Sequence, residues 1–275
     1  MGVAIHHMRR LGKRCYMGAS YDIPANIRVF AKHFGPHLEH IHNLKGVKIL
    51  DVTDYPQAEN EKIMNFYKSM FLRVDRVTCN SNAMKEKLSQ LYSDKIDVIF
   101  DPYLEPSLDT REVSEDIRIV WFGHSTNFES LKAVIEDTPI DAYDRFDIVC
   151  DVMKQDMENG KIRFIPWNID TQRRAIKEAN VALVTTNKAE ASSNRVLECL
   201  NAGLPVYATP NPANLDHVLY VNCGNNFKGW LASFRESQAL HISDVNRWKQ
   251  NEAQLWNRQA AGKLWEKVFS NVYEA

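Results

Sequence analysis

Residues 188–210 read KAEASSNRVLECLNAGLPVYATP, and they carry the most informative pattern in the sequence. The polar run Ser-Ser-Asn at 192–194 consists of residue types that cap helix N-termini, so a helix should begin there. Gly203 is expected to end that helix, and Pro205 to open the next strand. Because the stretch runs from one strand through a helix into another, it predicts one repeat of a parallel α/β sheet.

Two carboxylates are separated by seven residues in this stretch. Glu190 precedes the predicted helix, whereas Glu198 lies inside it. The residues around Glu198 are apolar on nearly all sides, and a carboxylate in such a helix is expected to have a partner. The alternative is a solvated helix residue, as most glutamates are. Arg195 lies in the first turn, where a cation opposes the helix dipole and makes sense if an anion binds beside it.

Strand-like and helix-like segments alternate on both sides of this stretch. Strands are expected at 27–32, 47–52, 75–79, 96–100, 117–123, 145–150, 162–166, 181–186, 204–209 and 219–223. Helices are expected at 36–44, 57–72, 82–92, 127–136, 170–179, 193–202 and 225–238. This alternation predicts α/β architecture with parallel sheets that helices cover on both faces.

A polar segment, EPSLDTREVSED at 105–116, interrupts the alternation and reads as a linker. The sequence therefore predicts two Rossmann-like parallel-sheet lobes. We expect the first lobe over 1–105 and the second over 106–240. Residues 241–275 are expected to form helices that pack back across the lobes.

Composition excludes several classes of protein. The chain is 44% hydrophobic and 25% charged, which is ordinary for a globular protein and excludes a disordered or coiled-coil chain. Its net charge of -1 argues against a nucleic-acid partner. No apolar run approaches the ~18–20 residues of a transmembrane segment. The cysteines are scattered and never spaced C-x-x-C, which favours reduced thiols in a cytoplasmic protein.

The loop at 123–127, Gly-His-Ser-Thr-Asn, joins a predicted strand to a predicted helix. A glycine in such a turn lets the backbone approach a phosphate closely. The helix that follows is expected to offer free N–H groups and the positive end of its dipole. Many strand-to-helix turns contain a glycine, so this loop alone is a weak signal for phosphate binding.

Together these segments resemble the retaining nucleotide-sugar glycosyltransferases of the two-lobed GT-B fold, the glycosyl transferases group 1 family. The resemblance covers roughly 27–235 and is most specific over 165–210, where E-x7-E precedes A-G-L-P-V. Its other segments are IRIVWFGHSTNFESL (117–131) in the donor lobe and KGVKILDVTDYP (45–56) and RVDRVTCNSNAMKEKL (73–88) in the acceptor lobe. The resemblance makes the first lobe the acceptor side, here short, and the second lobe the nucleotide-sugar donor side.

The resemblance also implies roles for single residues. Glu198 would accept hydrogen bonds from the ribose hydroxyls, and Glu190 would contact the ring hydroxyls of the transferred sugar. Gly123 would lie under the diphosphate, with His124 beside it in the same loop. The Arg195 guanidinium would neutralise the diphosphate charge. The backbone at the start of the helix, at Ser192, Ser193 and Asn194, would also help to neutralise the diphosphate charge.

Two further residues carry alternatives. Trp167 follows the strand that would read the base, and it would either stack on the base or be buried. His33 would touch the donor sugar, as a histidine of the family does, or serve as a structural histidine. The expected catalytic set is thus Glu190, His33 and Arg195. No metal site is expected, because Gly35-Pro36 breaks any helix that could align His33 with later histidines.

The function that this resemblance implies is transfer of a sugar from a UDP- or GDP-sugar, with retention and without metal or other cofactor. The acceptor would be a glycan, a lipid-linked sugar or a small molecule. The location would be the cytoplasm or the inner membrane face. One alternative is a nucleotide-sugar-binding protein that has lost transfer, since the 123–127 loop lacks the arginine and lysine that the family has there. A GT-B sugar-nucleotide epimerase is the other.

Overall fold

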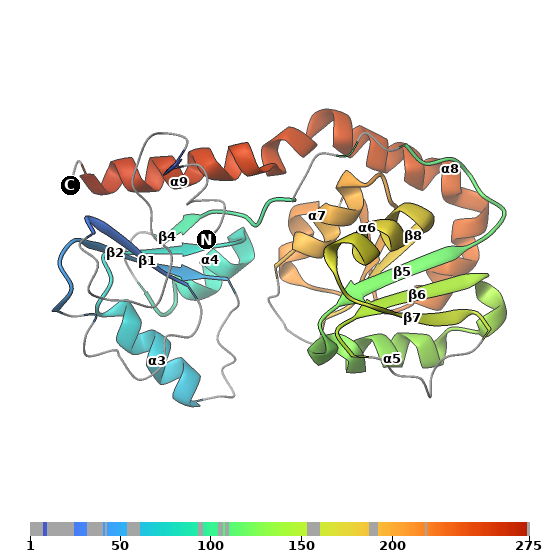
Figure 1. Cartoon of the computed structure of the whole chain (residues 1–275), viewed down its shortest axis with the longest axis horizontal. Coiled ribbons are helices and arrows are strands. Elements are labelled where there is room, and N and C mark those ends of the chain that lie inside the picture. The colour runs from blue at the N-terminus through green and yellow to red at the C-terminus, as the bar shows by residue number, and fades with distance from the viewer. Residues whose placement is uncertain are drawn as a thin grey trace. The chain divides into compact units, whose positions relative to one another are not determined.

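The chain forms two compact units in the computed structural model (Figure 1). The described residues are 8–9, 25–31, 41, 43–53, 61–92, 96–103, 107, 110–152, 160–186, 192–217 and 219–273. The first unit contains the described residues up to Pro102, Ser192, and those from Trp256 onward. The second unit contains the other described residues from Tyr103 to Leu255.

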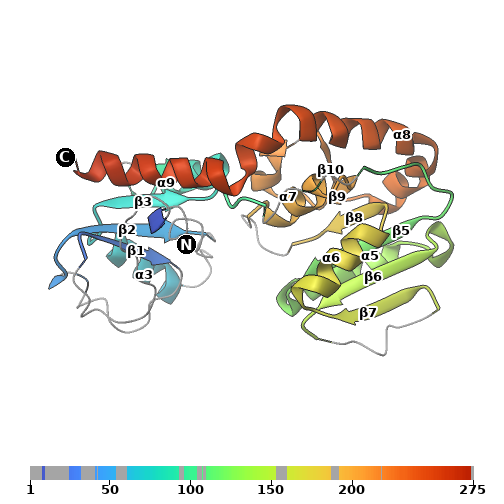
Figure 2. The ribbon, with the colours of Figure 1, turned by 45° about the horizontal axis from the view of Figure 1, so that its top comes forward.

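The first unit is built on a parallel sheet in the strand order β1-β2-β3-β4. Its strands are β1 (Ile27–Ala31), β2 (Val47–Val52), β3 (Arg76–Cys79) and β4 (Ile96–Val98). Its helices are α3 (Glu61–Phe71), α4 (Asn82–Leu88) and α9 (Arg258–Tyr273). Neighbouring side chains of β2 point to opposite faces: Leu50 packs with α3 and α4, and Ile49 packs with α9. Helices therefore cover both faces of this sheet (Figure 2).

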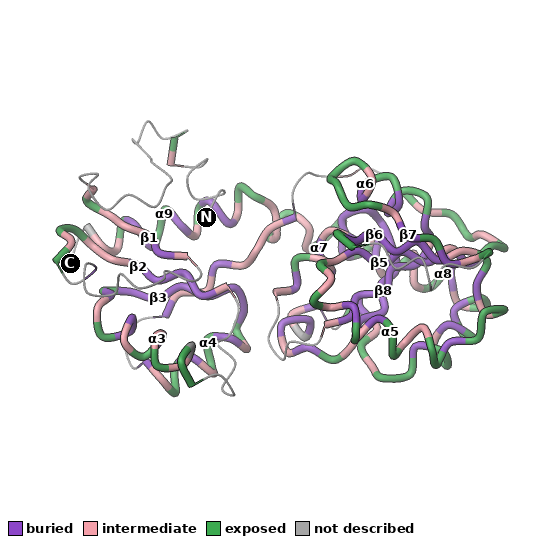
Figure 3. Tube along the Cα trace, turned by 60° about the horizontal axis from the view of Figure 1, so that its bottom comes forward, coloured by how far each residue is buried: buried purple, intermediate pink, exposed green. Residues whose placement is uncertain are grey.

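The second unit is built on a six-stranded parallel sheet in the order β10-β9-β8-β5-β6-β7. Its strands are β5 (Arg118–Gly123), β6 (Arg145–Cys150), β7 (Ile162–Pro166), β8 (Val181–Val184), β9 (Val206–Ala208) and β10 (Val221–Cys223). Its longer helices are α5 (Phe128–Asp137), α6 (Ile169–Glu178), α7 (Asn194–Asn201) and α8 (Phe227–Asn251). Short 3-10 turns are η1 (Ser125–Asn127), η2 (Ile140–Ala142), η4 (Pro212–His217) and η5 (Ala253–Trp256). Buried residues follow the strands of each sheet (Figure 3).

The two parallel sheets with their helices confirm the predicted fold class. In the second unit the strand order reverses between β5 and β8. Ligands of open α/β sheets bind beyond the carboxyl ends of the strands at such a reversal. The ends of β5 and β8 are therefore the place to look for a site.

The C-terminal helices are divided between the units. Helix α8 runs through the boundary that we expected at 240, because buried residues such as Phe234 and Trp248 continue along it. It lies in the second unit, whereas Trp265 and Phe269 of α9 pack in the core of the first. In the part of the chain that the structure describes, no helix is long and apolar enough to cross a membrane.

The segment expected to be a linker is fastened to the second unit. Arg111 donates hydrogen bonds to the carbonyl of Ile176 near the end of α6 (3.0 Å) and to that of Ala202 at the end of α7 (3.2 Å). The last carbonyls of a helix lack partners within it, and a cation also opposes their negative dipole end. Arg111 thus holds the ends of both helices.

Candidate donor site in the second unit

Helix α7 is formed as the sequence predicts. Four of its residues are buried as a hydrophobic stripe: Val196, Leu197, Cys199 and Leu200. Gly203 ends the helix with a φ of 76°, a backbone conformation that favours glycine. This packing leaves Arg195 and Glu198 half-buried on the helix. Because they are three positions apart, the two side chains are neighbours on its surface.

The Arg195 guanidinium lies at the reversal of strand order. It donates to the carbonyl of Phe122 in β5 (3.4 Å) and to that of Thr185, directly after β8 (2.7 Å). Burial lowers the pKa of Arg195 to about 10, so the side chain remains a cation at neutral pH. No carboxylate forms an ion pair with Arg195 among the described residues. A half-buried cation whose partners among the described residues are backbone carbonyls is suited to bind an anion.

Gly123 lies directly against this cation. A Cβ atom at Gly123 would be 3.1 Å from Nη1 of Arg195 and 3.0 Å from the ring of Trp121. The ring is itself fixed, since Trp121 is fully buried and its Nε1 donates to Oγ1 of Thr185 (2.9 Å). A side chain at position 123 would therefore push the guanidinium away from the strand ends.

We expect Gly123→Val to lower the free energy of unfolding by about 1–3 kcal/mol, the usual cost of overpacking. Gly160→Val is the matched control, because a Cβ atom at Gly160 meets nothing within 4 Å. Urea denaturation of both variants measures the difference. Equal losses of unfolding free energy in the two variants would show that Gly123 is not closely packed against Arg195 and Trp121.

The loop after Gly123 differs from the expectation of free N–H groups. The Ser125 N–H donates to Oδ1 of Asp151 (2.7 Å), and the Thr126 N–H donates to Nδ1 of His124 (3.2 Å). The Asn127 N–H donates to the carbonyl of His124 (2.9 Å). All three N–H groups of η1 are thus satisfied within the chain, so these three residues of the loop offer no free N–H group to a phosphate.

From its sequence context, in the loop after the strand expected at 145–150, Asp151 is expected to be a solvated residue, and the structure shows instead that it binds the neighbouring loop. Its carboxylate accepts from the N–H and the hydroxyl of Ser125 and lies 3.4 Å from Nε2 of His124. Burial raises the pKa of Asp151, but the hydrogen bonds from Ser125 and Cys150 outweigh it, and the net pKa is lowered. The residue is an ionised cap at neutral pH. No sequence signal marks it, because the contact depends on β5 and β6 lying side by side, with Gly123 opposite Cys150.

Trp167 is exposed rather than buried, so the buried alternative is wrong, and stacking on the base stays a prediction. The side chain is 53% exposed directly after β7. Its Nε1 donates to Oε1 of Gln172 (2.8 Å), and its backbone N–H donates to the carbonyl of Cys150 (2.9 Å). An exposed, hydrogen-bonded indole at the carboxyl end of a strand is available for stacking.

The remaining expected residues divide into two groups. Ser193 precedes α7 and is buried, Asn194 begins the helix and is exposed, and Ser192 is half-buried. The structure brings Gly123 and Arg195 together. Two expected catalytic residues lie outside the described residues: His33 and Glu190. Besides Asp151, the sequence reasoning missed Thr185 and His217, whose contacts come from other strands and turns.

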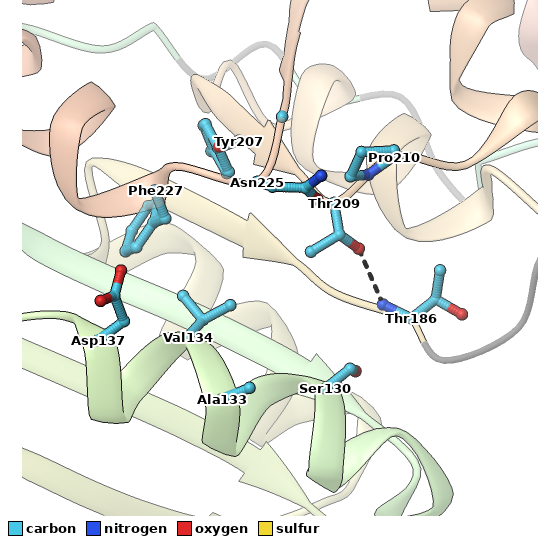
Figure 4. Close-up of a pocket in the computed structure, with 11 residues that line it drawn as sticks. Ser130, Ala133, Val134, Asp137, Thr186, Tyr207, Thr209, Pro210, Asn225 and Phe227 are labelled. Carbon is cyan, nitrogen blue, oxygen red and sulfur yellow. Dashed lines mark hydrogen bonds between the residues drawn. The ribbon is translucent and has the colours of Figure 1, made fainter.

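A pocket of about 560 Å³ lies beside this region, between α5 and the ends of β8, β9 and β10 (Figure 4). Ser130 and Asp137 line it from α5, and Thr186 and Thr209 from the strand ends. The Thr186 N–H donates to Oγ1 of Thr209 (3.2 Å). The described residues that line it include no cation, so the pocket does not suit a diphosphate.

The described residues contain no candidate metal site, because they include no group of three or more His, Cys, Asp or Glu that could hold a metal ion. The described cysteines are all free thiols: Cys79, Cys150, Cys199 and Cys223. Burial raises the pKa of Cys199 well above its usual range, so the thiol next to Glu198 remains protonated.

No protein-family model matches the chain, and no curated protein sequence matches it significantly. Solved structures do match. Anabaena HepE in complex with UDP and glucose has a TM-score of 0.69 at 12% identity, over 82% of this chain and 72% of HepE. Sucrose-phosphate synthase from Thermosynechococcus elongatus has 0.68 at 12%, over 86% of this chain and 71% of that enzyme. TarM has 0.67 at 11%, over 88% of this chain.

The similarity to these structures shows that the chain has the two-lobed GT-B fold, as predicted. The chain spans only 54% of the length of TarM. Sequence identity this low supports the fold and leaves the activity to be argued from the site.

Proposed function

We propose that the chain is a glycosyltransferase that takes its sugar from a nucleoside diphosphate sugar. The observation that carries this proposal is the half-buried Arg195 cation, which lies at the reversal of strand order, against Gly123, and lacks a carboxylate partner among the described residues. A diphosphate is the polyanion that such a position in this fold accommodates.

The reaction breaks the bond between the anomeric carbon of the sugar and a diphosphate oxygen. An acceptor hydroxyl oxygen then bonds to that carbon on the same face, and the departing diphosphate oxygen takes its proton. Negative charge develops on the departing diphosphate, and a fixed cation that needs no reorganisation stabilises it. In this proposal Arg195 supplies that charge, and the exposed Trp167 stacks on the base.

The two glutamates should divide the work. Glu198 is next to Arg195 on α7, so it can reach a ribose attached to the diphosphate. We expect Glu198→Gln to lower the affinity for a nucleoside diphosphate by about ten- to hundredfold, because a carboxylate that accepts from ribose hydroxyls makes charge-assisted hydrogen bonds. Glu190→Gln should leave that affinity nearly unchanged and lower the rate of transfer.

Calorimetry with the free diphosphate and rate measurements with the sugar donor test this division. Glu236→Gln is the matched control, since Glu236 is an exposed residue of α8. Loss of diphosphate binding in Glu190→Gln, with binding retained in Glu198→Gln, would mean that the donor is oriented the other way. No change in either variant would make the E-x7-E spacing accidental.

A second candidate function is a nucleotide-sugar-binding protein without transfer. The observation that favours it is the filled loop of η1, where Asp151 and His124 already occupy the N–H groups of Ser125 and Thr126. A donor would then have fewer contacts to its diphosphate. Hydrolysis or transfer of a radiolabelled nucleotide sugar, with cell-derived acceptors, separates the enzyme from the binding protein.

A further inference from the structure

Two turns of backbone begin beside Arg195 and Gly123. In η1, which leads into α5, the side chains of Asp151 and His124 accept from the N–H groups of Ser125 and Thr126. At the start of α7, the N-cap residue is Ser193, yet its side chain makes no capping hydrogen bond. A serine at this position ordinarily accepts from the N–H two or three residues later, here that of Arg195 or Val196.

The Ser193 hydroxyl is instead directed to a buried histidine. Its Oγ lies 3.3 Å from Nε2 of His217, and the two residues are 7% and 1% exposed. The backbone at Ser193 has a φ of -77° and a ψ of 9°, whereas N-cap residues that close the helix start are usually extended. The contact with His217 thus coincides with an uncapped first turn.

His217 is held in place by the turn to which it belongs. It is the last residue of η4, whose start is fixed because Asn211 accepts from the N–H of Ala213 with its side chain (3.0 Å) and from that of Asn214 with its carbonyl (2.9 Å). The carbonyl of His217 accepts from the N–H of Tyr220 (2.9 Å). Burial lowers the pKa of His217 to about 4, so the imidazole is neutral at physiological pH.

We propose that His217 is a positioning residue for the diphosphate: it holds the Ser193 hydroxyl away from the first turn of α7. This proposal rests on the function proposed above. With the hydroxyl held, no serine oxygen competes with a phosphate for the N–H groups of Arg195 and Val196. Without His217, Ser193 would be free to adopt the extended backbone of an ordinary N-cap residue, and its hydroxyl would then cap the helix and compete with the phosphate.

The test uses two replacements and their combination in the full chain, with UDP, GDP, uridine and guanosine as probes. His217→Phe should lower the affinity for the diphosphates by about fivefold, which corresponds to the usual strength of one N-cap. The affinity for the nucleosides should not change. Adding Ser193→Ala should restore affinity to within about twofold of the parent, because the competing oxygen is gone. His217→Gln, whose amide can still hold the hydroxyl, should bind like the parent. A double variant as weak as His217→Phe would mean that His217 contributes packing alone.

Amide hydrogen exchange at Arg195 and Val196 separates this proposal from the proposed function, because it needs no ligand. Exchange should slow in His217→Phe, where the cap forms, and return to the parent rate in the double variant. If the parent binds no nucleoside diphosphate but exchange behaves in this way, the capping mechanism stands and the donor assignment fails. Unchanged exchange in His217→Phe overturns the mechanism whatever the binding result.

Discussion

Arg195→Met should lower the affinity for a nucleoside diphosphate by about ten- to hundredfold, as expected for the loss of a charge-assisted contact. The affinity for the nucleoside should change little. Methionine keeps the apolar stem of the side chain but removes the cation and its bonds to the carbonyls of Phe122 and Thr185. Arg195→Lys should recover only part of the affinity, because one ammonium group cannot span both carbonyls and the ligand.

Calorimetry with the diphosphate and the nucleoside measures the two affinities for Arg195→Met. The control is Arg174→Met, which removes an exposed arginine from α6 of the same unit. Weakening of both ligands to the same extent in Arg195→Met would indicate that the guanidinium organises the strand ends rather than contacting the phosphates.

The largest effect on stability is expected from Asp147→Asn. Asp147 is 1% exposed in β6, where Arg163 binds it with two nitrogens (2.8 and 3.0 Å) and Arg145 with one (3.0 Å). Asparagine removes the charge that both arginines bind, although Arg145 keeps its ion pair with Glu178 (2.8 Å) and Arg163 is half exposed. Losing charge-assisted bonds to this buried acceptor should cost about 2–3 kcal/mol. For a protein of this size, Tm should fall by about 5–10 °C.

Thermal unfolding of Asp147→Asn beside Asp116→Asn measures this effect. Asp116 forms an ion pair with Arg118 (2.8 Å) in which both side chains are largely exposed, and exposed pairs contribute about 0–1 kcal/mol. Similar losses of stability in the two variants would mean that the arginines find other partners when the carboxylate is removed.

Local patterns predicted most of the elements of the second unit. The run RIVWFG forms β5 as expected, and residue types that favour caps and helix ends placed α7 between Ser193 and Gly203. These features depend on residues close in the chain. The carboxylate pair and the glycine loop directed attention to the ends of β5 and β8 for the same reason.

The contacts that complete the site depend on neighbours distant in sequence. Asp147 reads as a polar residue in a strand until the register sets it opposite Arg163. Ser193 reads as a helix cap, and only the turn that ends at His217 shows that its hydroxyl is used elsewhere. The acceptors for Arg195 are backbone carbonyls, which no side-chain pattern reveals.

We propose that the second unit binds a nucleoside diphosphate through the half-buried Arg195 cation and without a metal ion. Titration of the chain with UDP and GDP, beside uridine and guanosine and in the presence of a chelator, measures this binding. At least one diphosphate should bind at least about tenfold more tightly than its nucleoside, the strength of one charge-assisted contact. Equal affinity for diphosphate and nucleoside, or binding that returns only when Mg²⁺ or Mn²⁺ is added, would contradict it.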